Sequence, residues 1–133
     1  MLCLTDSMMT GVPQVDYQHR TLIDAINRFT DACAQGKGRK QIEETLDFVV
    51  SYTKEHFKDE ERIQEKSAFP GATAHKWLHT QFSMKISALV QEFRQTGPTV
   101  ILVGELNKTL ADWFINHIKT EDKKIGEHIK KTA

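Results

Sequence analysis

The sequence predicts an all-α fold, an antiparallel up-down-up-down four-helix bundle with an N-terminal arm. Glycine and proline divide the 133 residues into four long segments of helical composition, with breaks at 36–38, 70–71 and 97–98. Within each segment, apolar residues recur every three or four positions, which is the pattern of a helix with one buried face. Because the breaks are short, neighbouring helices are expected to run antiparallel.

The expected elements follow one another without a second domain. Gly11 and Pro13 close the arm, residues 1–14, and the bundle should occupy about residues 15–130 of a single domain over 1–133. The four core-facing seams are, in chain order, Val15, His19, Leu22, Ile26, Phe29 and Cys33; Ile42, Leu46, Val49, Thr53, His56, Glu60 and Ile63; His75, His79, Phe82, Ile86, Leu89 and Phe93; and Val103, Leu106, Leu110, Trp113 and His117.

Five of the six histidines lie in these seams, where a bundle core normally has apolar side chains. A buried imidazole without a polar partner is costly, so each one needs a hydrogen bond or a metal ion. A hydrogen bond within the core would explain any single histidine. It does not explain histidines on all four helices together with a seam glutamate, and we therefore predict a metal site.

The spacing of these residues agrees with a shared site. His56 and Glu60 form HxxxE, and His75 and His79 form HxxxH; residues four apart lie on one face of a helix. In an up-down-up-down bundle, all the candidate ligands fall at the same end: His19, His56, Glu60, His75, His79, His117 and Asp122.

Asp122 is the candidate whose spacing does not fit a regular helix. It follows His117 by five positions, which would place the two side chains about 140° apart around the axis. If both face one centre, the fourth helix must kink, loosen or end between Ile118 and Asp122. His128 has no partner at metal spacing, and we expect it to be solvated on the surface.

The type and number of ligands favour iron. Structural zinc takes four ligands, usually with thiolates, and magnesium and calcium prefer oxygen to imidazole. Imidazole with carboxylate suits iron, and a carboxylate can bridge two ions. Five histidines with Glu60 and Asp122 therefore fit two iron ions, with both carboxylates bridging and one coordination position left open.

The motif set resembles a known family. HxxxE, HxxxH and HxxxxD after an isolated upstream histidine are similar to the signature of the hemerythrins, and the chain looks like their bacterial members, the bacteriohemerythrins. The resemblance runs from the segment GVPQVDYQH at 11–19 to residues 122–124. It implies a four-helix bundle that binds dioxygen at a pair of iron ions joined by an oxo or hydroxo group.

The resemblance also assigns roles to the ligands. It implies that one iron is bound by His75, His79 and His117 and the other by His19 and His56. Glu60 and Asp122 would bridge, and dioxygen would bind to the iron that has two histidines. The apolar oxygen pocket of the family matches Leu22, Phe57, Trp113, Phe114 and Ile118.

Ordinary core packing explains the five pocket residues equally well. Two positions depart from the family pattern. Phe114 stands where many members have leucine, which alters the pocket volume. Leu4 stands where many bacterial members have a tryptophan in the arm.

The leading functional hypothesis is reversible dioxygen binding for storage, delivery or sensing, which is not an enzymatic activity. The alternative is a di-iron oxidase, peroxidase or nitric oxide reductase at the same site. Bundle enzymes that activate oxygen use a carboxylate-rich ligand set with ExxH, and this chain has no ExxH. Iron storage is disfavoured because an enclosed site with seven ligands holds two ions. A sensing role would require an unidentified protein partner, as would delivery.

The composition and charge give no support for nucleic acid or a membrane as a partner. Eighteen basic and eighteen acidic residues give no electrostatic argument for nucleic acid or an anionic membrane. No apolar stretch approaches the roughly 20 residues of a membrane span, and no basic segment precedes an apolar leader. The two cysteines form no CxxC pair. These features predict a cytoplasmic protein.

Overall fold

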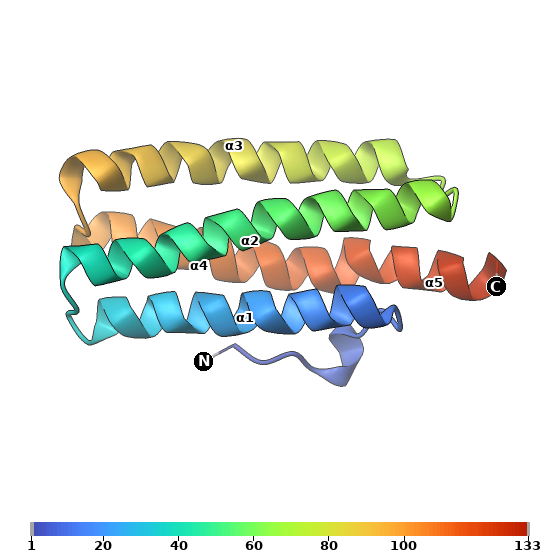
Figure 1. The fold of residues 1–133 in the computed structure, drawn as a ribbon, viewed down its shortest axis with the longest axis horizontal. Helices are drawn as coiled ribbons and strands as arrows, with labels where there is room; N and C mark the ends of the chain where they lie inside the picture. Colours follow the sequence, from blue (N-terminus) through green and yellow to red (C-terminus); the bar gives the residue numbers. More distant parts are fainter. Residues whose placement is uncertain (1, 133) are drawn as a thin grey trace.

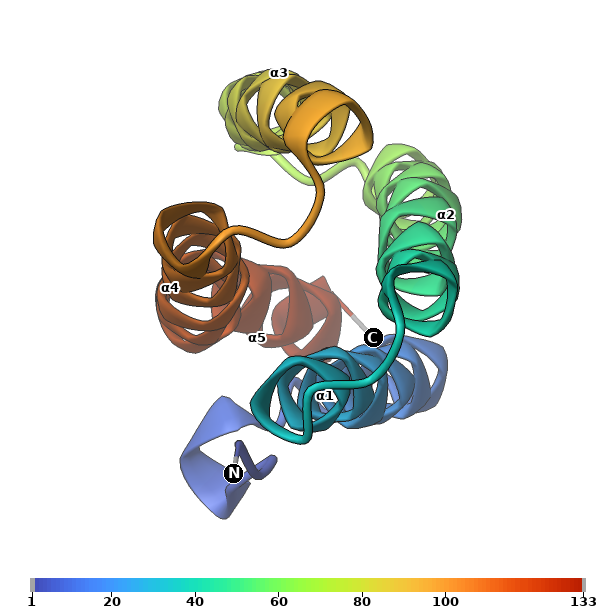
Figure 2. The same ribbon diagram turned by 90° about the vertical axis from the view of Figure 1, so that its left-hand side faces the viewer.

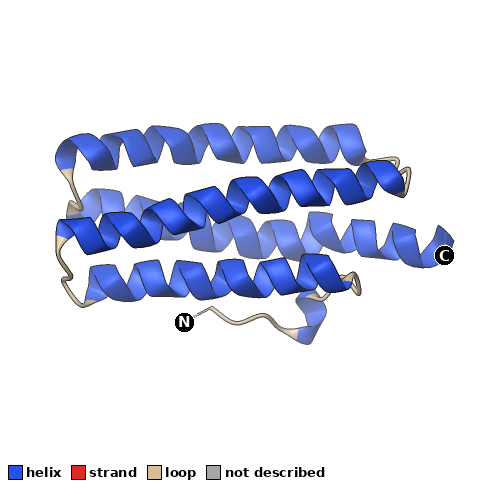
Figure 3. Cartoon of the chain, in the orientation of Figure 1, coloured by secondary structure: helices blue, strands red, loops and turns tan. Residues whose placement is uncertain are grey.

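Four long helices lie side by side, and each runs antiparallel to the one before it (Figures 1 and 2). They are α1 (Pro13–Ala34), α2 (Arg39–Lys66), α3 (Ala72–Thr96) and α4 (Val100–His117). The computed structural model describes residues 2–132, and none of these lies in a β-strand (Figure 3). The predicted all-α bundle is therefore confirmed.

The helices begin and end where glycine and proline were expected to interrupt them. Pro13 is the first residue of α1, where its missing N–H loses no hydrogen bond. In the connection to α2, Gly36 has a φ of 65°, a conformation that suits glycine. Thr99 precedes α4, and its hydroxyl accepts a hydrogen bond from the N–H of Leu102 at 3.2 Å. Each predicted break lies between two helices.

The fourth helix does not continue regularly. After α4 the chain forms a π-helical turn, η2 (Ile118–Asp122), and then α5 (Lys123–Thr132), which extends the line of α4 (Figure 1). A π-helix pairs residues five apart rather than four, so residues five apart return to the same face. The predicted deviation between Ile118 and Asp122 is confirmed, and Asp122 Oδ1 lies 3.0 Å from His117 Nε2.

The core contains apolar residues of all four predicted seams, and Leu106, Leu110 and His117 of the fourth seam are buried as predicted, but the other two predicted members of that seam are not. Leu102 and Phe114 are buried, whereas Val103 and Trp113 are only half-buried. The Trp113 ring lies between α3 and α4 and stacks on Phe82 with 4.0 Å between ring centroids. A seam one residue wide is too narrow a description of a helix whose neighbours contact it from two sides.

The N-terminal arm is docked along α1 (Figure 1). It contains a short 3₁₀ turn, η1 (Asp6–Met8), and Leu4 packs half-buried against the core. The carboxylate of Asp16 accepts hydrogen bonds from the N–H and hydroxyl of Thr10, both at 2.8 Å, and from the N–H of Gly11 at 3.1 Å. Among the described residues, no helix is both long and apolar enough to cross a membrane.

Candidate metal centre

All seven predicted ligands are brought together at one end of the bundle. They come from the start of α1, the end of α2, the start of α3 and the junction of α4 with η2. All are buried, and none is more than 4% exposed: His19, His56, Glu60, His75, His79, His117 and Asp122.

Glu60 lies between two groups of histidines. Its Oε1 is 2.8 Å from His75 Nε2 and 3.2 Å from His79 Nε2. Its Oε2 is 3.2 Å from His56 Nε2 and 3.7 Å from His19 Nε2. The two oxygens of one carboxylate thus face different histidines.

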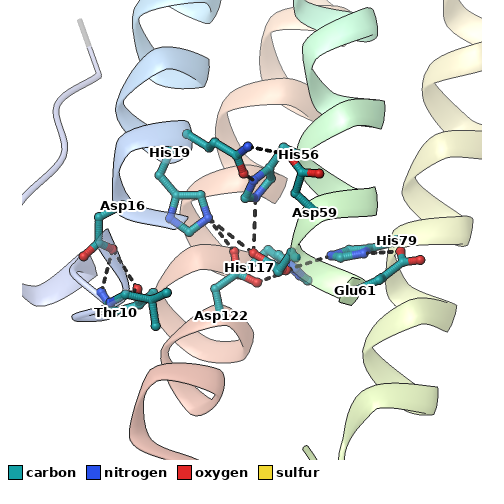
Figure 4. Close-up of polar contacts among 12 residues, drawn as sticks. Thr10, Asp16, His19, His56, Asp59, Glu61, His79, His117 and Asp122 are labelled. Atoms are coloured by element: carbon teal, nitrogen blue, oxygen red, sulfur yellow. Dashed lines mark hydrogen bonds and ion pairs between the residues drawn. The ribbon is translucent and has the colours of Figure 1, made fainter. Parts of the chain in front are cut away.

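Asp122 repeats this arrangement from the opposite helix (Figure 4). Its Oδ1 is 3.0 Å from both His75 Nε2 and His117 Nε2, and its Oδ2 is 2.8 Å from His19 Nε2. Each carboxylate therefore directs one oxygen at a three-histidine group and the other at a two-histidine group. Within each group, the candidate ligand atoms lie within 4.8 Å of one another.

Both carboxylates are held ionised. Burial alone raises the pKa of Glu60, but hydrogen bonds with the surrounding histidines bring that pKa well below its usual value. Burial and the charge of Glu60 raise the pKa of Asp122, but the close approach of the His117, His19 and His75 nitrogens lowers it more, so it also ends below its usual value.

The same contacts favour protons on two of the histidines. Burial lowers the pKa of His19, but the close carboxylates of Asp122 and Glu60 and their charges raise it to about 9. The pKa of His75 is likewise raised to about 9 by Asp122 and Glu60, against the effect of burial. The carboxylates thus attract positive charge to the space between the two histidine groups.

Several inward-facing atoms lack a hydrogen bond of acceptable geometry. They include Nε2 of His19, His56 and His79, together with Glu60 Oε2 and both carboxylate oxygens of Asp122. Buried polar atoms without partners are costly, and a cluster of them indicates a bound ion. Imidazole nitrogen and carboxylate oxygen without thiolate are a donor set that suits iron. The residues present therefore fit a pair of iron ions.

Two further side chains hold the histidines from outside. His56 Nδ1 lies 2.7 Å from Gln18 Oε1, and His79 Nδ1 lies 2.9 Å from Glu61 Oε2 (Figure 4). Hydrogen bonds of this kind orient metal-binding imidazoles. The sequence interpretation missed both residues, although each one is next to a predicted ligand in the chain.

Comparison with known proteins gives the family. The family model described as Hemerythrin HHE cation binding domain matches residues 10–129. The bacteriohemerythrin of Pseudomonas aeruginosa is 35% identical over 117 residues, which are 88% of this chain and 74% of that protein. The chain belongs to the hemerythrin family. Members of this family bind iron, and oxygen binding is the family function.

Other hemerythrins extend the comparison. The myohemerythrin of Riftia pachyptila is 29% identical over 117 residues, 88% of this chain and 84% of that protein. A crystal structure of wild-type hemerythrin superposes with a TM-score of 0.87 and 29% identity, and covers 97% of this chain and 98% of that one. The hemerythrin family is typically non-enzymatic.

Two of the residues matched to the hemerythrin oxygen pocket stack on histidines of the site. Phe57 stacks on His79 with 3.8 Å between ring centroids and 6° between planes, and Trp113 stacks on His117 at 4.3 Å and 12°. The other three pocket residues are at most 1% exposed: Leu22, Phe114 and Ile118. They provide apolar surroundings at this end of the bundle, and their contact with oxygen stays a prediction.

The expectation for His128 is wrong. Its side chain is half-buried rather than solvated, and its Nε2 lies 2.7 Å from the carbonyl oxygen of Ser67. The ring of Phe69 contacts it edge-on, with 5.6 Å between centroids. His128 ties α5 to the connection between α2 and α3, a long-range contact that local spacing does not reveal.

Proposed function

We propose that the seven residues hold two iron ions joined by an oxo or hydroxo group, and that this site binds dioxygen reversibly. The observation that carries the proposal is the placement of the carboxylates, since Glu60 and Asp122 each offer one oxygen to each histidine group. That is what two bridging carboxylates require. When bound, the iron pair would supply the two electrons needed to hold dioxygen.

The two iron positions would not be equivalent. His75, His79 and His117 with both carboxylates give five protein ligands, whereas His19 and His56 with the same carboxylates give four. Once the shared oxo or hydroxo group is added, only the two-histidine position retains an open site. Dioxygen would therefore bind on the side of His19 and His56.

The protein around the site would keep water and protons away. The proposed pocket residues offer no strong acid at their surfaces: Leu22, Phe57, Trp113, Phe114 and Ile118. Such apolar walls would supply no proton to release peroxide, so dioxygen could leave unchanged. The shortage of carboxylates and the absence of ExxH from the sequence also argue against an oxygen-activating enzyme.

On this proposal, residues 1–133 form one hemerythrin domain whose ligand is dioxygen and whose role is storage, delivery or sensing. A protein partner would serve delivery or sensing. We place the protein in the cytoplasm, where thiols such as those of Cys3 and Cys33, both unpaired, stay reduced.

The test is spectroscopic. The protein is loaded with iron, reduced without oxygen and then exposed to oxygen while the visible spectrum is recorded. A charge-transfer band that appears with oxygen, disappears under vacuum and returns supports reversible binding. Irreversible bleaching or catalytic consumption of oxygen or peroxide would favour an enzyme instead. Iron content near one per chain would contradict the paired site.

A further inference from the structure

A chain of three side chains connects the protein surface to the proposed ligand His56. Arg62 Nη1 donates to Asp59 Oδ1 at 3.1 Å, and Gln18 Nε2 donates to Asp59 Oδ2 at 2.8 Å. Gln18 Oε1 then lies 2.7 Å from His56 Nδ1. The side-chain exposure falls from 63% at Arg62 to 19% at Asp59, and His56 is 1% exposed. The chain thus leads from solvent into the site, and Figure 4 labels Asp59 and His56 along it.

The donors and acceptors in this chain permit one arrangement. An ionised carboxylate only accepts, so Asp59 requires the NH₂ group of Gln18 to face it. The amide oxygen of Gln18 must then face His56, and an oxygen acceptor requires a proton on His56 Nδ1. A neutral imidazole with its proton on Nδ1 has a free lone pair on Nε2, which here faces Glu60 Oε2 at 3.2 Å. That nitrogen is the one a metal needs.

The second oriented histidine has no such requirement. His79 Nδ1 meets the carboxylate of Glu61 directly at 2.9 Å, and a carboxylate can accept through either oxygen. An amide is different, because turning it over exchanges an acceptor for a donor. Gln18, unlike Glu61, therefore needs a further residue to fix which end of its amide faces the histidine.

We propose that Asp59 is a positioning residue for the two-histidine iron position: it fixes the orientation of the Gln18 amide, and Gln18 in turn fixes the proton of His56 on Nδ1. Arg62 holds the other oxygen of Asp59 and so limits its rotation. The inference rests on the proposed di-iron function, since it explains how the iron position that keeps an open site is prepared for metal.

The proposal predicts different effects for two substitutions of Asp59. In Asp59→Asn, the new amide oxygen accepts from Arg62, and its NH₂ group then faces Gln18. Gln18 must turn over and present NH₂ to His56, so Nδ1 becomes an acceptor and the proton moves to Nε2, where it blocks the metal. In Asp59→Ala, nothing forces Gln18 to turn. Asp59→Asn, although it keeps the size of the side chain, should therefore weaken iron binding more than Asp59→Ala.

Iron affinity tests this order. Iron(II) binding is measured without oxygen, by competition with a chelator. We expect Asp59→Asn to weaken binding about tenfold or more, as outer hydrogen-bond partners of metal ligands do, and Asp59→Ala to weaken it less. Combining Asp59→Asn with Arg62→Ala frees the new amide and should restore the affinity to that of Asp59→Ala. The matched control is Asp47→Asn, on the same helix, which loses a pairing with Arg94 (3.5 Å) and should stay within twofold of the parent.

A second readout needs no iron. Nitrogen-15 NMR of the iron-free protein reports whether His56 Nδ1 carries a proton, and Gln18→Ala identifies the signals of the pair. We expect a protonated Nδ1 in the parent and in Asp47→Asn, and an unprotonated one in Asp59→Asn. An unchanged Nδ1 in Asp59→Asn, or affinities no lower for Asp59→Asn than for Asp59→Ala, would overturn the proposal. If the parent fails to bind two irons, the proposed function is wrong, and the NMR result still decides the role of Asp59.

Discussion

At the scale of single residues, Glu60 and Asp122 differ from the histidines because each of them faces both ligand groups. A histidine offers one nitrogen to one position, whereas the two oxygens of Glu60 lie 2.8 Å from His75 and 3.2 Å from His56. Loss of a histidine should therefore weaken one iron position first. Loss of a carboxylate should affect both.

Replacing Glu60 by glutamine tests this difference. The amide keeps one oxygen but presents NH₂ to one histidine group, so it cannot bridge, and we expect both irons to be lost together. Iron content per chain, measured after gel filtration, checks this. Glu65→Gln on the same helix is the control, since Glu65 is exposed. A variant that retains one iron would show that Glu60 does not bridge.

Gln64 is a second residue for the single-residue scale, because burying its unpaired amide lowers the stability of the fold by an amount that can be measured. It lies one turn beyond Glu60, is 1% exposed, and neither polar atom of its amide has a hydrogen-bond partner. Gln64→Met removes these buried polar atoms at similar volume, and we expect the free energy of unfolding to rise by about 1 to 2 kcal/mol. Chemical denaturation of the iron-free protein measures this. Gln81→Met, at an exposed position of α3, should change stability by less than about 0.5 kcal/mol.

The seven residues that converge at the candidate site could be predicted from sequence, but the side chains that hold them in place could not. A histidine in an apolar seam stands out locally, because burial without a partner is costly. Gln18, Asp59 and Glu61 are ordinary polar residues in the chain. Their roles arise from the contact of α1 with α2 and of α2 with α3, which no spacing within one helix reveals.

At the scale of the elements, the same distinction between local and long-range information applies. Helix ends were predictable, because proline and glycine impose them through the backbone. The deviation at Ile118–Asp122 was predictable too, although not its π form, because HxxxxD cannot face one centre on a regular helix. The docking of the arm against α5 was not predicted, and it includes one close approach. A side chain at Gly126 would collide with the carbonyl of Thr10.

Two glycine-to-alanine substitutions distinguish the effect of helix propensity on stability from the effect of the contact between Gly126 and Thr10. Gly104→Ala in α4 has open space around the new methyl group and should stabilise the protein by about 0.5 to 1 kcal/mol. Gly126→Ala in α5 gains the same propensity but displaces the arm, and we expect a net loss of about 1 to 3 kcal/mol. Thermal unfolding of both variants measures the contrast. Equal stabilisation would show that the arm does not press on α5.

At the scale of the whole molecule, the stability of the bundle should depend on whether the site holds protons or iron. The iron-free protein keeps two buried carboxylates ionised, and protons on His19 and His75 balance their charge. Iron would replace those protons, because metal binding requires the neutral imidazole. Protons and iron thus compete for one cluster that contacts all four helices, and pH should affect the two forms in opposite ways.

The sign of the effect follows from the pKa values. His19 and His75 have pKa values of about 9 in the folded iron-free protein, against a usual 6.5, so their stabilising contribution is complete below about pH 6.5 and is lost as pH rises to 9. Glu60 and Asp122 have lowered pKa values, and their contribution is present above about pH 4.5 and is lost in acid. The iron-free protein should therefore be most stable between these limits.

Thermal unfolding without oxygen, from pH 5 to 9, tests the competition. We expect the Tm of the iron-free protein to fall between pH 6.5 and 9, whereas that of the iron-loaded protein holds or rises, because fewer protons then oppose the metal. Replacing His19 and His75 by glutamine should flatten the alkaline fall of the iron-free form, since glutamine has no proton to lose. If the iron-free protein gained stability over this range, the histidines would not be the groups that balance Glu60 and Asp122.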